Sequence, residues 1–191
     1  MDFTLTANLP IVFDDGILMV DINMGDGSFV KSCFDRHVAM VYGFEERDDL
    51  FIEAENKLAD YRDNCKLYRQ RVSRSDKNND VDATRFDFII SHLPPVDILK
   101  ISCGKEIYPI LMTSNYLDRI RSIIGQLPGT SCRCNAPRKA SDYSVGLLSH
   151  PKVGDLKKYL EIKGFNVEIS KNKILAYRNG GIAFTTPLSK V

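Results

Sequence analysis

Residues 17–27 read ILMVDINMGDG, an apolar run that ends in two glycines on either side of an aspartate. Because glycine adopts the positive φ angles of tight hairpin turns, residues 25–27 predict a turn between two antiparallel strands. An EF-hand calcium loop is not supported, since its sixth position would be Asp26 instead of glycine. With further short apolar runs at 11–13, 28–34 and 38–44, the sequence predicts an N-terminal antiparallel β-meander.

Residues 50–73 carry apolar side chains at alternating spacings of three and four, which predicts a long central amphipathic helix. The stripe consists of Phe51, Ala54, Leu58, Tyr61, Cys65, Tyr68 and Val72. Acidic residues near its start and basic residues near its end suit the helix dipole. The stripe could form a dimerising seam, but alanine, tyrosine and cysteine fill such a seam poorly. Packing on the protein's own sheet is therefore the favoured interpretation.

Residues 73–84 lack apolar periodicity and predict an exposed loop, the best candidate for a domain boundary. It would separate an acidic unit, 1–75, from a basic unit, 85–191, although the two could also form one domain. In the mixed middle region we expect strands at 86–90, 98–103 and 107–112 and a helix at 115–127. The C-terminal α-β-β-β unit would comprise a helix between Pro151 and Gly164 and strands at 166–170, 173–178 and 182–185. The expected fold class is α+β.

Charge is distributed very unevenly along this chain of 191 residues. Residues 1–60 hold 4 basic and 13 acidic side chains, whereas residues 129–191 hold 11 basic and 4 acidic ones. Opposite charges at opposite ends can steer protein partners or orient copies head to tail, and salt should weaken such contacts. The first interpretation is therefore a non-enzymatic binding or assembly protein, of the kind found in viruses and phages, that associates with a protein partner or with itself.

An RNA- or DNA-binding module is the second interpretation, because the basic residues of the later part of the chain alternate with tyrosines that could stack on bases. The candidate contacts to a nucleic acid or other partner are Arg69, Arg71, Arg74, Arg133, Arg138, Lys139, Lys157, Lys158, Lys171, Lys173 and Arg178. The overall isoelectric point near 7.6 is lower than that of most dedicated nucleic-acid binders.

Histidines and cysteines supply weaker candidates. His92 and His150 each follow a serine and lie near a proline, and together they could serve as acid and base in metal-independent phosphodiester cleavage. Cys132 and Cys134 could begin a metal site, but zinc needs four ligands. Helix capping and turn formation explain the histidines without catalysis, so an enzyme is the third interpretation.

The composition also bears on the compartment. No stretch approaches the ~20 apolar residues of a membrane span, and the first residues lack a secretory signal. Five cysteines, an odd number, favour reduced thiols. We therefore expect a cytoplasmic or nuclear protein that is not secreted and has no cofactor, and we assign the sequence to no family.

Overall fold

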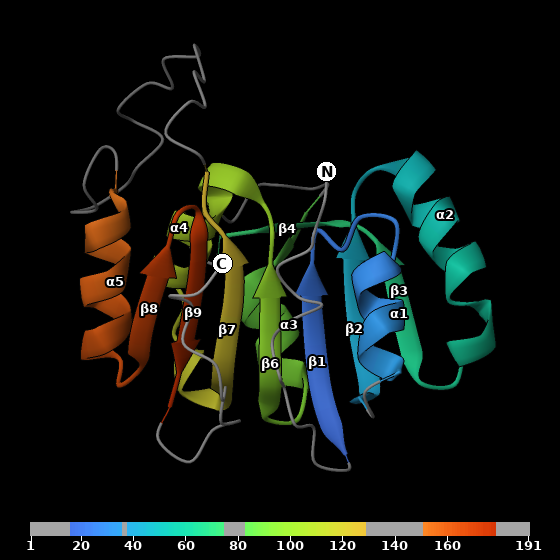
Figure 1. The fold of residues 1–191 in the computed structure, drawn as a ribbon, viewed down its shortest axis with the longest axis horizontal. Helices are drawn as coiled ribbons and strands as arrows, with labels where there is room; N and C mark the ends of the chain where they lie inside the picture. The colour runs from blue at the N-terminus through green and yellow to red at the C-terminus, as the bar shows by residue number, and fades with distance from the viewer. Residues whose placement is uncertain (1–15, 36–37, 75–82, 129–150, 179–191) are drawn as a thin grey trace.

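A buried strand, β1 (Ile17–Ile22), lies in the interior of a seven-stranded sheet, between β2 and β6 (Figure 1). The computed structural model describes residues 16–35, 38–74, 83–128 and 151–178. All six residues of β1 are buried, as expected for a strand covered on both faces of a parallel sheet. The other strands are β2 (Val38–Glu45), β3 (Cys65–Arg69), β6 (Val96–Ile101), β7 (Ile120–Gln126), β8 (Asn166–Ser170) and β9 (Lys173–Tyr177).

The strand order is β3-β2-β1-β6-β7-β9-β8. Neighbouring strands from β3 to β7 run parallel, whereas β9 runs antiparallel to both β7 and β8. The chain moves outward from β1 to β3 and then returns to β6 on the other side of β1. The strand order thus reverses at β1, and such a reversal is where open α/β sheets bind ligands, beyond the carboxyl ends of the strands. A separate two-stranded parallel sheet joins β4 (Arg71–Ser73) to β5 (Ala83–Arg85).

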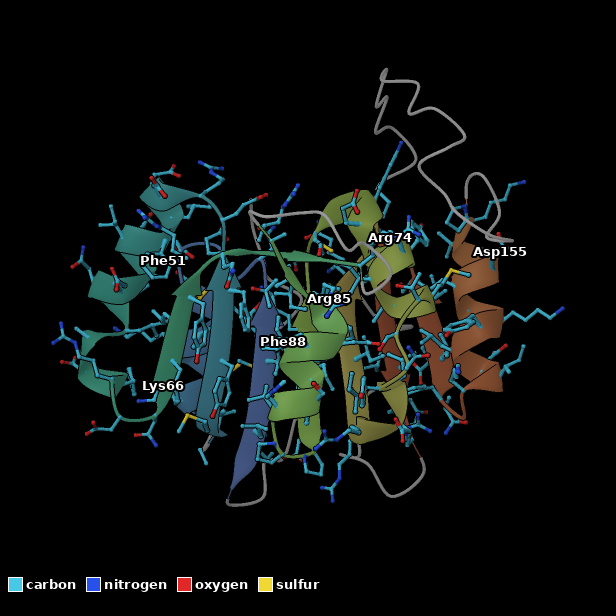
Figure 2. The ribbon with its side chains drawn as sticks, turned by 180° about the vertical axis from the view of Figure 1, so that it is seen from behind. Phe51, Lys66, Arg74, Arg85, Phe88 and Asp155 are labelled. Atoms are coloured by element: carbon cyan, nitrogen blue, oxygen red, sulfur yellow. The ribbon has the colours of Figure 1, made fainter. Side chains whose placement is uncertain are left out.

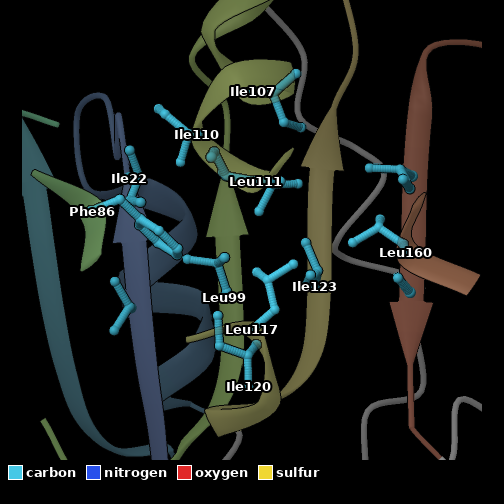
Figure 3. Packing of buried hydrophobic residues seen from close by; sticks show 14 of the residues in the cluster. Ile22, Phe86, Leu99, Ile107, Ile110, Leu111, Leu117, Ile120, Ile123 and Leu160 are labelled. Carbon is cyan, nitrogen blue, oxygen red and sulfur yellow. The ribbon is translucent and has the colours of Figure 1, made fainter. Parts of the chain in front are cut away.

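Helices cover both faces of the large sheet. One apolar cluster joins β1 and β2 to α1 (Ser28–Phe34) and α2 (Asp48–Lys57). The other joins the opposite face to α3 (Phe86–His92), α4 (Ile107–Met112) and α5 (Val153–Ile162). Figure 3 shows the second cluster, in which Ile22, Phe86 and Leu99 lie together. Short 3₁₀ turns, η1 (Ala59–Tyr61), η2 (Gly104–Glu106) and η3 (Leu117–Arg119), complete the three-layer arrangement.

The predicted α+β class and N-terminal meander are wrong, because the first described strands are parallel. Residues 28–34 form helix α1 instead of a strand, and β1 pairs with β2 in parallel register. The glycines after β1 lead into a helix that crosses over the sheet, so they do not close a hairpin. The buried residues of α1, Phe29, Val30 and Cys33, have helical spacing. Residues 11–13 lie outside the described residues.

The predicted long helix over 50–73 is also wrong. The helix α2 ends at Lys57, and the apolar stripe continues through η1 into strand β3. Residues 65–69 gain a full ladder of hydrogen bonds beside β2, where Cys65 pairs with Val41 and Arg69 with Glu45. Tertiary pairing therefore overrides a helical spacing built from cysteine and tyrosine, which are weak helix formers.

Three elements of the middle region differ from the prediction in type. Residues 86–90 and 107–112 form α3 and α4 in place of strands, and residues 120–126 form β7 in place of a helix. The buried residues of α3 again have helical spacing, whereas β7 is buried on both faces and so lacks the alternation expected of a strand. The strand predicted at 98–103 exists as β6.

The C-terminal part follows the prediction over its described length. Helix α5 is followed by Gly164 with φ +86°, and strands β8 and β9 meet at a turn formed by Lys171 and Asn172. The third predicted strand, at 182–185, lies outside the described residues. In the described part of the chain, no helix has both the length and the apolar character needed to cross a membrane.

Candidate functional site

The loop between β1 and α1 forms the centre of the candidate site. Asn23, Gly25 and Gly27 all have positive φ angles, of 61°, 69° and 76°. The backbone N–H groups of Asn23 and Met24 both donate to the carbonyl of Phe44 on β2, at 2.8 and 3.1 Å. Positive φ angles favour glycine and tolerate asparagine, so the residue types match the path of the backbone.

The two glycines have different surroundings. A Cβ atom on Gly27 would stand 3.1 Å from side-chain atoms of both Ala54 and Leu58, so this position lets α2 approach the loop closely. A Cβ atom on Gly25 would meet no atom within 4 Å. The space beside the Gly25 Cα atom is therefore unfilled, whereas Gly27 serves packing.

Glu45, the last residue of β2, connects this loop to the start of α2. Its Oε2 atom accepts a hydrogen bond from the backbone N–H of Gly25 at 2.8 Å, and Oε1 accepts one from Arg47 at 3.0 Å. The side chain is only 1% exposed. It forms no ion pair within the described ranges, although the pKa of Arg47 is raised mainly by Asp49 and to a smaller extent by the charge of Glu45.

A buried ion pair lies at the carboxyl ends of β1 and β6. The Lys100 ammonium is 2.8 Å from Oδ1 of Asp21, and the two residues are 4% and 0% exposed. Lys100 also donates to the carbonyl of Asn23 at 3.5 Å, and its ammonium lies 5.3 Å from the centre of the Phe29 ring. Burial raises the pKa of Asp21 above its usual value, and Lys100 offsets only part of that rise.

A second ion pair holds the loop from the side of α2. Lys57 donates to Oδ2 of Asp26 and, at 2.7 Å, to the hydroxyl of Ser28. Asp26 also accepts from the backbone and hydroxyl of Ser28. Burial alone would raise the pKa of Asp26, but the hydrogen bonds from Lys57 and Ser28 outweigh it and lower the pKa to about 2. Asp26 is thus ionised at neutral pH, and its carboxylate holds the loop through Ser28 and Lys57.

The end of β6 borders the loop on its other side. The Asn23 side chain donates to the carbonyl of Ser102 at 2.8 Å, and the Ser102 N–H donates to the carbonyl of Ile22 at 3.0 Å. Burial raises the pKa of the adjacent Cys103 thiol to about 12, so Cys103 stays protonated at neutral pH and is a poor nucleophile. The ends of β1, β2 and β6 therefore meet around one loop.

The histidine pair proposed from the sequence stays a prediction, because only His92 is among the described residues. His92 ends α3 just before β6 begins, at the amino ends of the strands, and its Nδ1 atom lies 2.8 Å from the carbonyl of Phe88. His150 lies outside the described residues, as do Cys132 and Cys134. Across the described ranges, no group of three or more histidine, cysteine, aspartate or glutamate side chains could hold a metal ion.

The basic residues named from the sequence are dispersed over the fold. Arg69, Arg71 and Lys157 contact the carboxylates of Asp48, Glu46 and Glu161, respectively. Arg74 is 3% exposed, and Lys158 lies on the exposed face of α5. Lys171 and Lys173 share the β8–β9 turn. Arg133, Arg138 and Lys139 are outside the described residues.

Arg178 forms hydrogen bonds with backbone carbonyls inside the protein. Its guanidinium donates to the carbonyls of Ile120, Lys163 and Leu117 at 3.1, 2.7 and 3.1 Å. The same group lies 4.0 Å from the centre of the Phe165 ring. These contacts fasten the end of β9 to the turn after α5 and to the start of β7.

Sequence reasoning missed Asn23, Gly25, Glu45 and Ser102. A signal for two of them was present, because an apolar strand followed by Gly25-Asp26-Gly27 has an acidic residue, Glu45, 20 positions after the first glycine. A strand, a glycine loop and a later acid at about that distance are typical of nucleotide-binding α/β units. Ser102 has no comparable sequence signal, since only the sheet brings it beside Asn23.

The fold is similar to those of several solved enzymes. A precorrin-6y C5,15-methyltransferase from Geobacter metallireducens matches with a TM-score of 0.54 and 13% identity, over 92% of this chain and 86% of that one. A magnesium protoporphyrin IX methyltransferase from Synechocystis, solved with bound SAH, matches with a TM-score of 0.53 and 15% identity, over 86% and 74%. A precorrin 8w decarboxylase from Methanobacterium thermoautotrophicum gives 0.52 and 16%, over 92% and 87%.

No model of a known protein family matches the chain, and no curated protein matches it either. At these identities the likeness to solved structures concerns the fold. The interpretation as a non-enzymatic binding or assembly protein rested on the uneven charge of the chain, and these matches correct it, because the three solved chains named above are enzymes. The seven-stranded sheet has instead the arrangement found in these methyltransferases.

Proposed function

We propose that this protein binds S-adenosylmethionine at the carboxyl ends of β1, β2 and β6 and acts as a methyltransferase. The observation that carries the proposal is the contact between Gly25 and Glu45. It joins a loop position without a side chain to a carboxylate on the neighbouring strand, at 2.8 Å. Both lie where the strand order reverses, which is the ligand-binding position of open α/β sheets.

The available hydrogen-bonding groups fit the adenosine half of this cofactor. Its ribose carries two hydroxyl donors, and a carboxylate is an acceptor with about four lone-pair sites. Glu45 uses one site on each oxygen for Gly25 and Arg47, which leaves one site on each oxygen. Because Glu45 is 1% exposed, a ribose reaches these sites only when the groups that cover them move.

The charges around the loop also fit. The cofactor carries positive charge on its sulfonium and amino groups, so a carboxylate without a cationic partner favours its binding. Asp21 and Asp26 are paired with Lys100 and Lys57, respectively. Glu45 forms no ion pair among the described residues, so its charge is less neutralised than the charges of Asp21 and Asp26.

Each residue of the loop has a distinct part in this proposal. When bound, the cofactor supplies a methyl group for transfer to a nucleophile. Gly25 lets a ligand approach the backbone, and Glu45 accepts hydroxyl hydrogen bonds. Lys57 holds the loop from the side of α2, and Lys100 donates to the carbonyl of Asn23, so the loop backbone keeps its position while the groups that cover Glu45 move.

Isothermal titration with S-adenosylmethionine tests the proposal. We expect Glu45→Gln to weaken binding by roughly tenfold to a hundredfold, because a hydrogen bond to a charged group contributes about 1.5–3 kcal/mol. The matched control is Glu168→Gln, which alters a glutamate bonded to Tyr177 in the β8–β9 hairpin. Wild-type protein that does not bind, or a Glu45→Gln variant that binds as tightly as wild type, would refute the proposal.

A further inference from the structure

We propose that Lys171 and Lys173, at the tip of the β8–β9 hairpin, bind a phosphate group of the molecule that accepts the methyl group. This inference rests on the proposed function. The cofactor would occupy the carboxyl ends of β1, β2 and β6, and the acceptor would lie beside it, over the ends of β6 and β7. The inference concerns the substrate class of that same site.

The strand register places the two lysines beside the site. Ile101 at the end of β6 pairs with Gly125 on β7, and Gly125 pairs with Ile174 on β9. Neighbouring strands lie about 4.8 Å apart, so the start of β9 is roughly 10 Å from the end of β6. Lys173 opens β9 and therefore lies within reach of a substrate bound over the ends of β6 and β7.

The hairpin tip is held firmly at this edge. Lys171 adopts a left-handed conformation with φ 54°, and the carbonyl of Asn172 accepts a hydrogen bond from the N–H of Leu127 at 2.6 Å. Leu127 directly follows β7, so this bond ties the tip to the carboxyl end of that strand. The two lysines thus have backbones fixed relative to β7, and only their side chains need to be ordered by a ligand.

Among the described residues, the charges of Lys171 and Lys173 are not paired with an acidic side chain. Neither Lys171 nor Lys173 takes part in an ion pair with any residue that the structure describes. Lys171 and Lys173 are two positions apart at one turn, and burial together with the charge of Lys171 lowers the pKa of Lys173, as expected for like charges near each other. A bound anion would relieve that repulsion.

Two more lysines lie toward the same edge. Lys105 is part of η2, which follows the end of β6, and Lys152 immediately precedes α5. Neither forms an ion pair among the described residues. Figure 2 shows Asp155 at the upper end of α5, and this nearest acid of the helix accepts from the backbone N–H of Lys152. Asp155 therefore caps the helix through the backbone of Lys152 and forms no ion pair with the Lys152 side chain.

Phosphate fits the tip better than a carboxylate does. A phosphate monoester carries a charge of about −1.5 to −2 at neutral pH, and two successive phosphodiesters of a nucleic acid carry −1 each, so either matches two ammonium groups, whereas a single carboxylate carries only −1. Lysine binds phosphate as a point charge and needs no fixed planar geometry. Two adjacent lysines on a rigid turn are thus suited to one phosphate group.

The test uses full-length protein and two probes, inorganic tripolyphosphate and a fluorescent ten-nucleotide single-stranded RNA. The variant Lys171→Glu/Lys173→Glu is compared with Lys66→Glu/Lys158→Glu, which makes the same change in net charge. Lys66 lies near the opposite ends of the strands (Figure 2), and Lys158 is exposed on α5. S-adenosylmethionine affinity is measured for every variant by titration.

We expect the Lys171/Lys173 variant to bind a phosphate probe at least tenfold more weakly, with unchanged S-adenosylmethionine affinity. A plot of the logarithm of RNA affinity against the logarithm of salt concentration should become less steep. Its slope should change by about 0.7 for each RNA phosphate that the variant no longer neutralises. Weaker binding of both probes indicates recognition of phosphate itself, and weaker binding of RNA alone indicates a nucleic-acid acceptor. Both results support the inference.

Equal effects of the two charge-reversed variants would overturn the inference, because they would reflect net charge alone. Unchanged binding of both probes would also overturn it, as would an oligoglutamate peptide that binds wild type as tightly as the RNA does. Absence of S-adenosylmethionine binding by wild-type protein would count against the proposed function instead, so the two failures are distinguishable.

Discussion

At the scale of single residues, the site depends on charges that are taken out of water and then paired. Asp21 and Lys100 are both almost fully buried, with their charged atoms 2.8 Å apart. A buried pair of this kind adds little net stability, because the cost of desolvation offsets the attraction. Removal of one partner is expensive, since the other charge then stays buried without compensation. The pair therefore acts as a constraint on the position of the loop.

Replacing Lys100 alone should be far more damaging than replacing both partners. We expect Lys100→Met to lower the free energy of unfolding by about 3–5 kcal/mol, because Asp21 is left as an uncompensated buried acid. Asp21→Asn/Lys100→Met should recover at least about 1 kcal/mol relative to the sum of the single changes. Urea denaturation of wild type and the three variants measures this coupling. Strictly additive effects would show that the ion pair does not couple these residues.

At the scale of elements, Arg178 shows how one side chain fixes the relative positions of several segments. Its guanidinium donates hydrogen bonds to carbonyls of η3, β7 and the turn after α5. Gly164 lies in that turn, and a Cβ atom there would stand 2.9 Å from Nη1 of Arg178. The glycine thus supplies a positive φ angle and also the space for the arginine.

Arg178→Lys should destabilise the protein by about 2–4 kcal/mol, because lysine cannot donate to three carbonyls in a fixed planar arrangement. Arg121→Lys is the matched control, since the exposed Arg121 forms a single ion pair with Asp97 and its replacement should cost under about 1 kcal/mol. Thermal unfolding of both variants provides the comparison. If the two substitutions had equal effects, the internal contacts of Arg178 would not contribute to stability.

In the C-terminal part, the correctly predicted elements have local signals at their ends. Gly164 ends α5, and the turn at Lys171 and Asn172 separates β8 from β9, so nearby residues are enough to predict these elements. Strand β7 carries no such signal, because burial on both faces removes the alternation that marks a strand. Strand β3 lies in a stretch with helical spacing, and its pairing with β2 depends on contacts outside its own segment.

The candidate site was predictable only in part. The glycine loop and Glu45 are visible as a spacing in the sequence, but the same Gly-Asp-Gly chemistry also suits a hairpin. What distinguishes the two structures is whether the next segment pairs as a strand or crosses over as a helix. That choice depends on the packing of Phe29, Val30 and Cys33 against α2 and β1, and their helical spacing extends over too few residues to decide it alone.

At the scale of the whole molecule, the sheet combines strands from both sides of the predicted boundary at 73–84. Strand β1 pairs with β2 on one side and with β6 on the other. Chain segments that precede and follow residues 75–82 thus share hydrogen bonds in the middle of the sheet. The candidate site has the same composite origin, since Glu45 comes from the first part and Ser102 from the second.

This interleaving predicts that the chain unfolds as one cooperative unit. Separation of β1 from β6 would expose Val20, Leu99 and their neighbours in the shared apolar cluster, so neither half keeps its core without the other. Far-ultraviolet circular dichroism and tyrosine fluorescence should therefore give coincident urea transitions. Saturating S-adenosylmethionine, at about a hundred times its Kd, should raise the free energy of unfolding by about 2.7 kcal/mol, as measured by either signal. Two separated transitions, with only one moved by the ligand, would show that the halves fold independently and that the site belongs to one of them.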